Sequence, residues 1–316
     1  MKKISIIIPM KNEEQSIPEL WARLVVALGK IDWQWEVIFI DDGSTDRTLE
    51  VLNVLREKDS RARVLSFVRN FGKASALQAG FDNAKGDYVL TMDADLQHEP
   101  EEIPNFVTKL KEGNDMVISW RHKRRDNALT RKIPSWLANR IIEKMSGLKL
   151  HDFGGTFHAY RKELLEGIEL YSELHRFIPA LANWNGGYKY VELPINNPDR
   201  KYGKSNYGLG RIYKVIVDLI VVKYFASYVN RPLQIFGSVG FSLLVLGVLG
   251  NIFLLYKKVF LGTLVLVEHG PLFMVSIFLV IIALQFIFFG IMAEMLSRIY
   301  FRSSDRHIYK LRTEME

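Results

Sequence analysis

The chain has 316 residues and a formal charge of +7, with 48% hydrophobic and 24% charged residues. This length allows one large or two ordinary domains, and the composition excludes a disordered or collagen-like chain. The sequence has no cysteine, which excludes disulfides, thiolate nucleophiles and cysteine-ligated metal sites. Charged residues are frequent in the first two-thirds and apolar residues dominate the last third. We therefore expect a globular domain joined to a membrane segment.

Short apolar runs alternate with helical patterns in the N-terminal part of the chain. We expect strands at 4–8, 36–40, 64–68 and 88–92, and helices at 16–28, 49–58 and 74–84. This alternation predicts an α/β domain with a parallel, doubly wound sheet. Ligands of such sheets bind beyond the carboxyl ends of the strands. The polar clusters Asp41-Asp42 and Asp93-Ala94-Asp95 follow strands in this way, so the pattern indicates a nucleotide-type site.

Neither common phosphate-binding loop is present, because the sequence has no Gly-x-Gly-x-x-Gly after its first strand and no Walker-type Gly-x-x-x-x-Gly-Lys-Ser/Thr loop. Phosphate charge would then be met by a divalent cation and by arginines. Asp93 and Asp95 lie two residues apart, so both can face the same way in an extended segment. Carboxylate oxygens suit Mg²⁺ or Mn²⁺. A solvated acidic turn is the alternative for an isolated Asp-x-Asp, and the position at a strand end favours the metal.

Two stretches without any charged residue, 233–256 and 272–293, lie near the C-terminus. Each exceeds the ~20 residues that a helix needs to cross a bilayer. We expect transmembrane helices at 232–256 and 271–295, joined by an external loop at 257–270. Buried helices of a soluble core are the alternative, and uncharged runs of this length are uncommon there.

Lysine and arginine are frequent on both outer flanks of this pair and sparse in the loop between its helices. By the positive-inside rule, the globular domain and both termini should be cytoplasmic, in a multi-pass protein of the cytoplasmic membrane. Segment 207–231 has the pattern of a juxtamembrane amphipathic helix that lies on the membrane. Segment 296–316 is predicted to be a basic cytoplasmic tail, with a solvated basic face as the alternative.

Several motifs in order along the chain resemble successive blocks of the family-2 glycosyltransferases with the GT-A fold: Ile6–Glu13, Asp41–Asp46, Arg69–Lys73 and Met92–Gln97. The C-terminal half narrows the resemblance to polyprenyl-phosphate glycosyltransferases, similar to dolichyl-phosphate mannose synthase and bacterial undecaprenyl-phosphate sugar transferases. The matching pieces there are 152–155, 159–162, 175–179, and Arg200 followed by Ser205. The resemblance implies a GT-A (Rossmann-like) cytoplasmic domain at 1–206 and two C-terminal transmembrane helices with flanking interfacial helices.

The resemblance also implies roles for individual residues. The nucleotide-sugar site would comprise Pro9, Asn12, Glu13, Ile40, Asp41, Asp42, Lys73, Asp93, Ala94 and Asp95. Asp95 and Gln97 would hold Mg²⁺ or Mn²⁺ on the diphosphate, and the catalytic groups would be Asp93, Asp95, Arg121 and Arg131. The acceptor phosphate would meet Arg124, Arg125, Arg131, Arg200 and Ser205. A solvated basic loop is the alternative for the arginine run.

The implied reaction is the inverting transfer of a sugar from a nucleotide-diphosphate sugar, with a UDP-sugar favoured, to undecaprenyl phosphate. The identity of the sugar stays open. A processive polysaccharide synthase is one alternative, although two spans offer little channel wall and the sequence has no Gln-x-x-Arg-Trp block. A catalytically inactive membrane scaffold is another.

The positive charge concentrates beside the two spans. A membrane lipid is therefore a better partner than a nucleic acid for these residues. The resemblance further implies a homo-oligomer.

Overall fold

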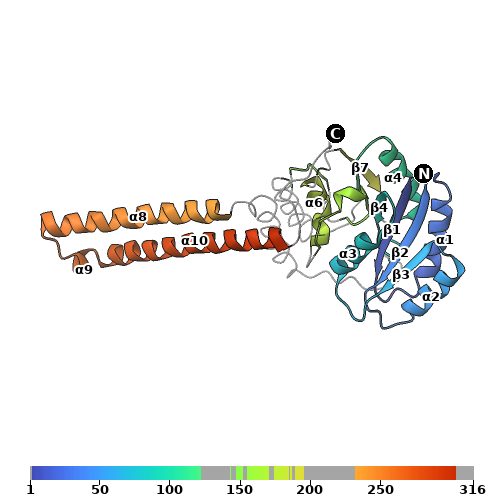
Figure 1. Ribbon diagram of the computed structural model, residues 1–316, viewed down its shortest axis with the longest axis horizontal. Coiled ribbons are helices and arrows are strands. Elements are labelled where there is room, and N and C mark those ends of the chain that lie inside the picture. Colours follow the sequence, from blue (N-terminus) through green and yellow to red (C-terminus); the bar gives the residue numbers. More distant parts are fainter. Residues whose placement is uncertain are drawn as a thin grey trace. The chain divides into compact units, whose positions relative to one another are not determined.

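The computed structural model describes residues 2–121, 143, 147–151, 155–170, 174–184, 186, 189–195 and 232–303. The chain divides into two compact units, Met1–Val222 and Lys223–Glu316 (Figure 1). The predicted amphipathic helix at 207–231 lies outside the described residues, as does the part of the basic tail from 304 to 316.

A seven-stranded sheet with the strand order β3-β2-β1-β4-β6-β5-β7 forms the centre of the N-terminal unit. The first four strands, β1 to β4, pair in parallel, whereas β6 is antiparallel to both β4 and β5. The four strands that the sequence predicted are therefore parallel, as expected, but the sheet as a whole is mixed, because the strand–helix alternation behind the prediction covers only β1 to β4. The strands are β1 Lys3–Met10, β2 Gln34–Asp41, β3 Ala62–Ser66, β4 Tyr88–Thr91, β5 Met116–Arg121, β6 His158–Arg161 and β7 Tyr190–Ile195.

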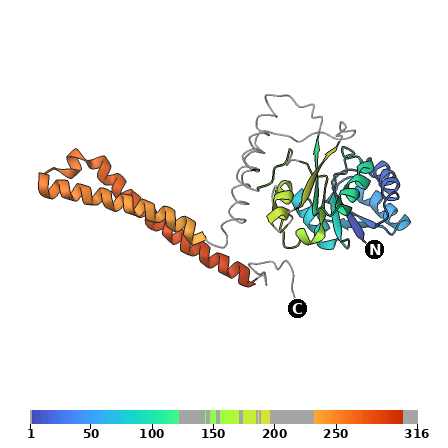
Figure 2. The ribbon, with the colours of Figure 1, turned by 90° about the horizontal axis from the view of Figure 1, so that it is seen from above.

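Helices cover both faces of this sheet (Figures 1 and 2). Side chains of α1 (Ile17–Leu28), α2 (Thr48–Lys58) and α4 (Ile103–Lys111) join one hydrophobic cluster. Those of α3 (Lys73–Asn83) and α6 (Ile178–Trp184) join the other. The described residues of this unit also form three short 3-10 helices: η1 (Pro100–Glu102), η3 (Lys162–Leu164) and η4 (Leu174–Phe177). The predicted α/β architecture is confirmed.

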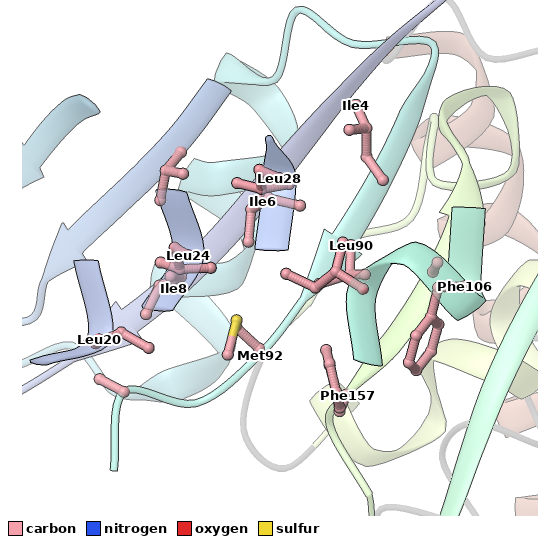
Figure 3. Packing of buried hydrophobic residues seen from close by; sticks show 14 of the residues in the cluster. Ile4, Ile6, Ile8, Leu20, Leu24, Leu28, Leu90, Met92, Phe106 and Phe157 are labelled. Atoms are coloured by element: carbon pink, nitrogen blue, oxygen red, sulfur yellow. The ribbon is translucent and has the colours of Figure 1, made fainter. Parts of the chain in front are cut away.

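Strand β1 contributes to both layers of the core because its side chains alternate between the two faces of the sheet. Ile4, Ile6 and Ile8 pack with the α1 and α4 side chains in the cluster of Figure 3. Ile7 packs in the opposite cluster. All four are fully buried, and each contributes about 1.5–3 kcal/mol through removal of apolar surface from water.

Proline does not end strand β1, contrary to our expectation. Pro9 pairs in register with Ile40, and the strand continues to Met10. The Met10 carbonyl accepts the Asp42 N–H on the β2 side, so the neighbouring Pro9 backbone points to the β4 side. Strand β4 has ended there, opposite Ile7. The β1–β4 ladder ends on this side after the Met92 N–H donates to the Ile7 carbonyl, and the missing N–H of Pro9 leaves the pairing of β1 with β2 intact.

Strand β3 ends earlier than the sequence pattern predicted. Ser66 is its last residue and pairs beside Asp41. Val68, which we expected inside the strand, lies in the following loop and is 95% exposed. The strand pattern depends only on the run of apolar side chains, which includes Val68. Pairing depends on the neighbouring strand β2, which ends opposite Ser66. Strand β3 therefore ends two residues before the predicted end, and the β3–α3 loop begins at Phe67.

The C-terminal unit is a helical hairpin of α8 (Pro232–Leu261) and α10 (Gly270–Ser303), with the short α9 (Val265–Glu268) between them. Both long helices are long and apolar enough to cross a membrane. α8 continues past the predicted boundary at 256 and ends before Gly262, whose φ is +63°. Lys257 and Lys258 end the apolar run without ending the helix, because lysine is a good helix former. The predicted connection 257–270 is therefore shortened.

Small residues spaced by seven along both helices allow close packing of the hairpin. Gly240 and Gly247 of α8 are buried against Ala283 and Ser276 of α10. A Cβ at Gly240 would lie 2.9 Å from the Ala283 carbonyl oxygen, and one at Gly247 would lie 2.9 Å from that of Ser276. Small residues at such contacts are typical of helix pairs in membranes.

Candidate active site

The parallel strands β1, β2 and β4 end at one edge of the sheet, and the predicted nucleotide-sugar residues follow them there. The loop that follows β1 and the loop that follows β2 are joined at this edge by hydrogen bonds. The Asn12 N–H donates to Ser44 Oγ at 2.9 Å, and the Thr45 N–H donates to Asn12 Oδ1 at 2.8 Å. The Glu13 N–H donates to Thr48 Oγ1 at 2.9 Å. Asn12 has a φ of +55°, a conformation that asparagine tolerates better than most residues.

Asp41 and Asp42 are both buried at the end of β2. Asp41 accepts hydrogen bonds from the Ser44 N–H at 3.0 Å and from Ser66 Oγ at 2.9 Å. Asp42 accepts from the N–H groups of Phe71 at 2.7 Å and Gly72 at 2.9 Å. The Asp42 carboxylate therefore holds the β3–α3 loop. It retains acceptor capacity for a further donor, since a carboxylate offers about four lone-pair sites.

We expect Asp42→Asn to raise KM for the nucleotide sugar and also to lower the melting temperature. The asparagine amide would present an N–H₂ group where one carboxylate oxygen now accepts a backbone N–H, at a cost of about 1–3 kcal/mol. Steady-state kinetics and thermal unfolding in the same detergent measure both effects. A variant with a raised KM and unchanged melting temperature would show that the loop contacts add no stability.

Both oxygens of the Asp93 carboxylate have partners within the chain. One of its oxygens forms an ion pair with Lys73 Nζ, and the other accepts from Thr156 Oγ1 at 2.9 Å. Its backbone N–H donates to His98 Nδ1 at 3.0 Å. Burial raises the pKa of the Asp93 carboxyl, but the charge of Lys73 and the contacts of His98 and Thr156 outweigh it and hold that pKa well below its ordinary value. Asp93 is therefore ionised and fixed in orientation.

Asp95 is 8% exposed, and its Oδ1 accepts the Gln97 N–H at 3.1 Å. Between them, Leu96 has a φ of +59° and a side chain buried in the core. A leucine in this conformation costs about 1–3 kcal/mol, and such strain clusters at functional sites. The turn that carries the second aspartate is thus maintained against local preference by core packing.

The chemistry of this donor set fits a divalent cation that is shared with substrate phosphates. Among the described residues, no group of three or more His, Asp or Glu side chains could enclose a metal ion. Both Asp93 oxygens already contact Lys73 and Thr156. Asp95 and Gln97 are then the candidate ligands, and Mg²⁺ is commonly held by one or two carboxylates together with phosphate oxygens.

The remaining predicted site residues divide into three groups. Pro9, Ile40 and Ala94 lie at the same edge, in β1, in β2 and after β4. Arg121 is the last residue of β5, and its side chain is not described. The predicted acceptor residues lie outside the described residues: Arg124, Arg125, Arg131, Arg200 and Ser205.

Thr156 is a site residue that the sequence reasoning missed. It comes immediately after the Gly154-Gly155 block and before β6, and its hydroxyl reaches Asp93 because β6 pairs with β4. Only that antiparallel pairing, which the sequence did not predict, brings the two residues together.

Comparison with solved structures supports the class of fold. A crystal structure of glucosyl-3-phosphoglycerate synthase from Mycobacterium tuberculosis, in complex with Mn²⁺, UDP and phosphoglyceric acid, matches with a TM-score of 0.55 at 21% identity. The match covers 70% of this chain and 78% of that one. The mixed sheet with acidic residues at its carboxyl edge is that of the GT-A glycosyltransferases.

Sequence comparison is more specific. Residues 5–168 match the model of glycosyl transferase family 2. Dodecaprenyl-phosphate galacturonate synthase of Rhizobium johnstonii is 38% identical over 98% of this chain and 92% of the relative. Undecaprenyl-phosphate 4-deoxy-4-formamido-L-arabinose transferase of Shewanella sediminis is 35% identical over 94% and 88%. The chain belongs to glycosyl transferase family 2 and is a glycosyltransferase. The resemblance to polyprenyl-phosphate glycosyltransferases is confirmed by these relatives.

Proposed function

We propose that this enzyme transfers a sugar from a UDP-sugar to undecaprenyl phosphate, with inversion at the anomeric carbon. The observation that carries the proposal is the pair of differently held aspartates at the carboxyl edge of the sheet, Asp93 against Lys73 and Asp95 beside Gln97. The relatives named for transfer to dodecaprenyl and undecaprenyl phosphate support the acceptor class. The UDP bound to the structural neighbour supports the nucleotide.

Positioning and charge neutralisation are the main tasks of the protein in this reaction. The acceptor is already an anionic phosphate, so its oxygen attacks the anomeric carbon without a strong general base. Ionised Asp93, oriented by Lys73 and Thr156, would accept hydrogen bonds from ribose or sugar hydroxyls. Asp95 and Gln97 would hold Mg²⁺ or Mn²⁺, which supplies charge stabilisation for the departing diphosphate. Asp42 would orient the base while it holds the β3–α3 loop.

The acceptor phosphate would be bound by the basic residues near and after β5 and before the first apolar helix. We assign this role to Arg124, Arg125, Arg131, Arg200 and Ser205, with Arg121 and Arg131 neutralising charge at the reacting centre. Guanidinium groups suit this task because they bind phosphate oxygens through paired N–H donors. Asn206 follows Ser205 where the family commonly has lysine, and Lys201 or Lys204 would supply that charge.

The proposal requires the catalytic unit to be on the cytoplasmic side with both termini. We expect a reporter fused after Glu316 to be cytoplasmic and one inserted at Gly262, between α8 and α9, to be periplasmic. Paired fusions with a phosphatase and a fluorescent reporter measure this topology. Finding both positions on one side of the membrane would contradict the hairpin.

A donor screen tests the proposed function. The full-length protein is purified, mixed with undecaprenyl phosphate and one UDP-sugar at a time, and lipid-linked product is detected by mass spectrometry. UDP-galacturonate and UDP-4-deoxy-4-formamido-L-arabinose come first because the relatives' names contain these sugars. A single favoured UDP-sugar is the expected result. Binding of nucleotide sugar by calorimetry without any lipid product would instead favour the scaffold alternative.

A further inference from the structure

Exposed apolar side chains are rare on the described surface of the N-terminal unit, and half of them lie on one loop. Four large hydrophobic residues are exposed there: Val26, Val54, Val68 and Phe71. Val68 and Phe71 belong to the β3–α3 loop, residues 67–72, and are 95% and 49% exposed. The other two lie on α1 and α2, one on each helix. The loop therefore carries the most exposed large apolar side chain in the described part of this unit, Val68.

The loop is held to the active-site edge by its backbone. The N–H groups of Phe71 and Gly72 donate to Asp42, and the Phe67 N–H donates to the Asp41 carbonyl. Gly43, with a φ of +63°, packs so closely that a Cβ there would lie 2.4 Å from the Arg69 carbonyl carbon. Val68 is thus exposed on a loop that is held beside the same aspartates that form the candidate nucleotide site.

Arg69 adds a positive charge to this apolar tip. Its guanidinium lies over the Phe71 ring, 4.5 Å from the ring centroid, and Phe67 contacts the same ring edge-on at 5.6 Å. An aliphatic side chain, an aromatic ring and a cation together suit the boundary between anionic headgroups and acyl chains. A partner protein would also accept apolar surface, but this chain carries its own two helices suited to a membrane.

We infer that the β3–α3 loop is a membrane contact, in which Val68 and Phe71 enter the interfacial layer and Arg69 meets anionic headgroups. The inference rests on the proposed function, because a lipid acceptor requires the carboxyl edge of the sheet to approach the membrane. The contact would set the height and tilt of this edge above the headgroups. Asp42 links the contact to the nucleotide site through a single side chain.

The absence of cysteine from the sequence allows a direct test. Val68→Cys in the full-length protein is labelled with the environment-sensitive fluorophore NBD and reconstituted in nanodiscs of phosphatidylethanolamine and phosphatidylglycerol. Val26→Cys and Val54→Cys, which are also exposed valines of the same unit, are matched controls. We expect doxyl-labelled lipid to quench the probe at position 68 several-fold more than at 26 or 54, and Phe71→Cys to behave like Val68→Cys.

Equal quenching at 68, 26 and 54 would overturn the inference. A blue-shifted emission at 68 that doxyl lipid does not quench would also overturn it, and would indicate a protein contact instead. An emission change caused only by UDP with Mn²⁺ would place the loop on the nucleotide, against the inference. The readout does not use turnover, so its failure leaves the donor screen unaffected. A failed screen with a quenched probe would contradict only the proposed function.

Discussion

Asp95→Asn is expected to lower kcat by about 100-fold or more while the protein remains folded. The substitution keeps the size of the side chain but removes the charge of the carboxylate that we assign to the metal. Stabilisation of a departing diphosphate by a bound cation contributes several kcal/mol, and each 1.36 kcal/mol corresponds to a factor of ten in rate. Single-turnover measurement of lipid-linked product gives this effect without interference from product release.

Asp82→Asn is the matched control, because Asp82 is exposed on α3, where its carboxylate accepts a hydrogen bond from Gln78 of the same helix. It should retain wild-type kcat. EDTA should abolish activity of the wild type, and Mn²⁺ or Mg²⁺ should restore it. Normal turnover in EDTA, or a near-normal kcat for Asp95→Asn, would show that no metal at this position supports the chemistry.

Lys73→Met has the second largest expected effect, a loss of about tenfold or more in kcat/KM. The Lys73 and Asp93 side chains are 31% and 29% exposed, so their interaction is partly screened and lies toward the lower end of the 1.5–3 kcal/mol typical of charge-assisted hydrogen bonds. Methionine preserves the aliphatic length but removes the charge that orients Asp93. Steady-state kinetics with the preferred donor measure the loss.

Two further variants, Lys73→Arg and Thr156→Val, distinguish a role of Lys73 in orienting Asp93 from a role in the stability of the fold alone. Arginine keeps the charge and should recover part of kcat/KM, whereas Thr156→Val removes the neutral contact to Asp93 and should cost less than Lys73→Met. Thermal unfolding of all three reports stability. If Lys73→Met lost activity only in proportion to its folded fraction, Lys73 would be a structural residue and not a positioning one.

Local patterns were sufficient to predict most of the first half of the catalytic unit. The β1–α1–β2–α2 order and the two apolar helices follow from period and length. The ends of the first four elements lie within two residues of the predicted ones, whereas α8 and α10 continue five and eight residues beyond the predicted spans. The pattern could not predict β6, because antiparallel insertion between β4 and β5 depends on contacts between segments far apart in the sequence. It also placed Val68 in a strand, since an apolar residue has no local signal for the point where a neighbouring strand stops pairing.

In the candidate site too, local motifs predicted which residues are present, whereas their contacts depend on tertiary pairing. The motifs identified Asp41, Asp42, Asp93 and Asp95 by type and position, but not how each carboxylate is held. The Asp42 contact to the β3–α3 loop and the Thr156 contact to Asp93 both arise from tertiary pairing. These contacts assign Asp42 a structural task beside its expected contact with the base. They also leave Asp95 as the better candidate metal ligand.

The most direct test of the account compares two acceptors that differ only in the phosphate. The full-length enzyme is given its preferred UDP-sugar with Mn²⁺ and either undecaprenyl phosphate or undecaprenol, and lipid-linked sugar is quantified by mass spectrometry. Because no strong general base is proposed to activate a hydroxyl, the account predicts product with undecaprenyl phosphate and none with undecaprenol. Equal transfer to both acceptors, or release of free sugar without any lipid product, would contradict it.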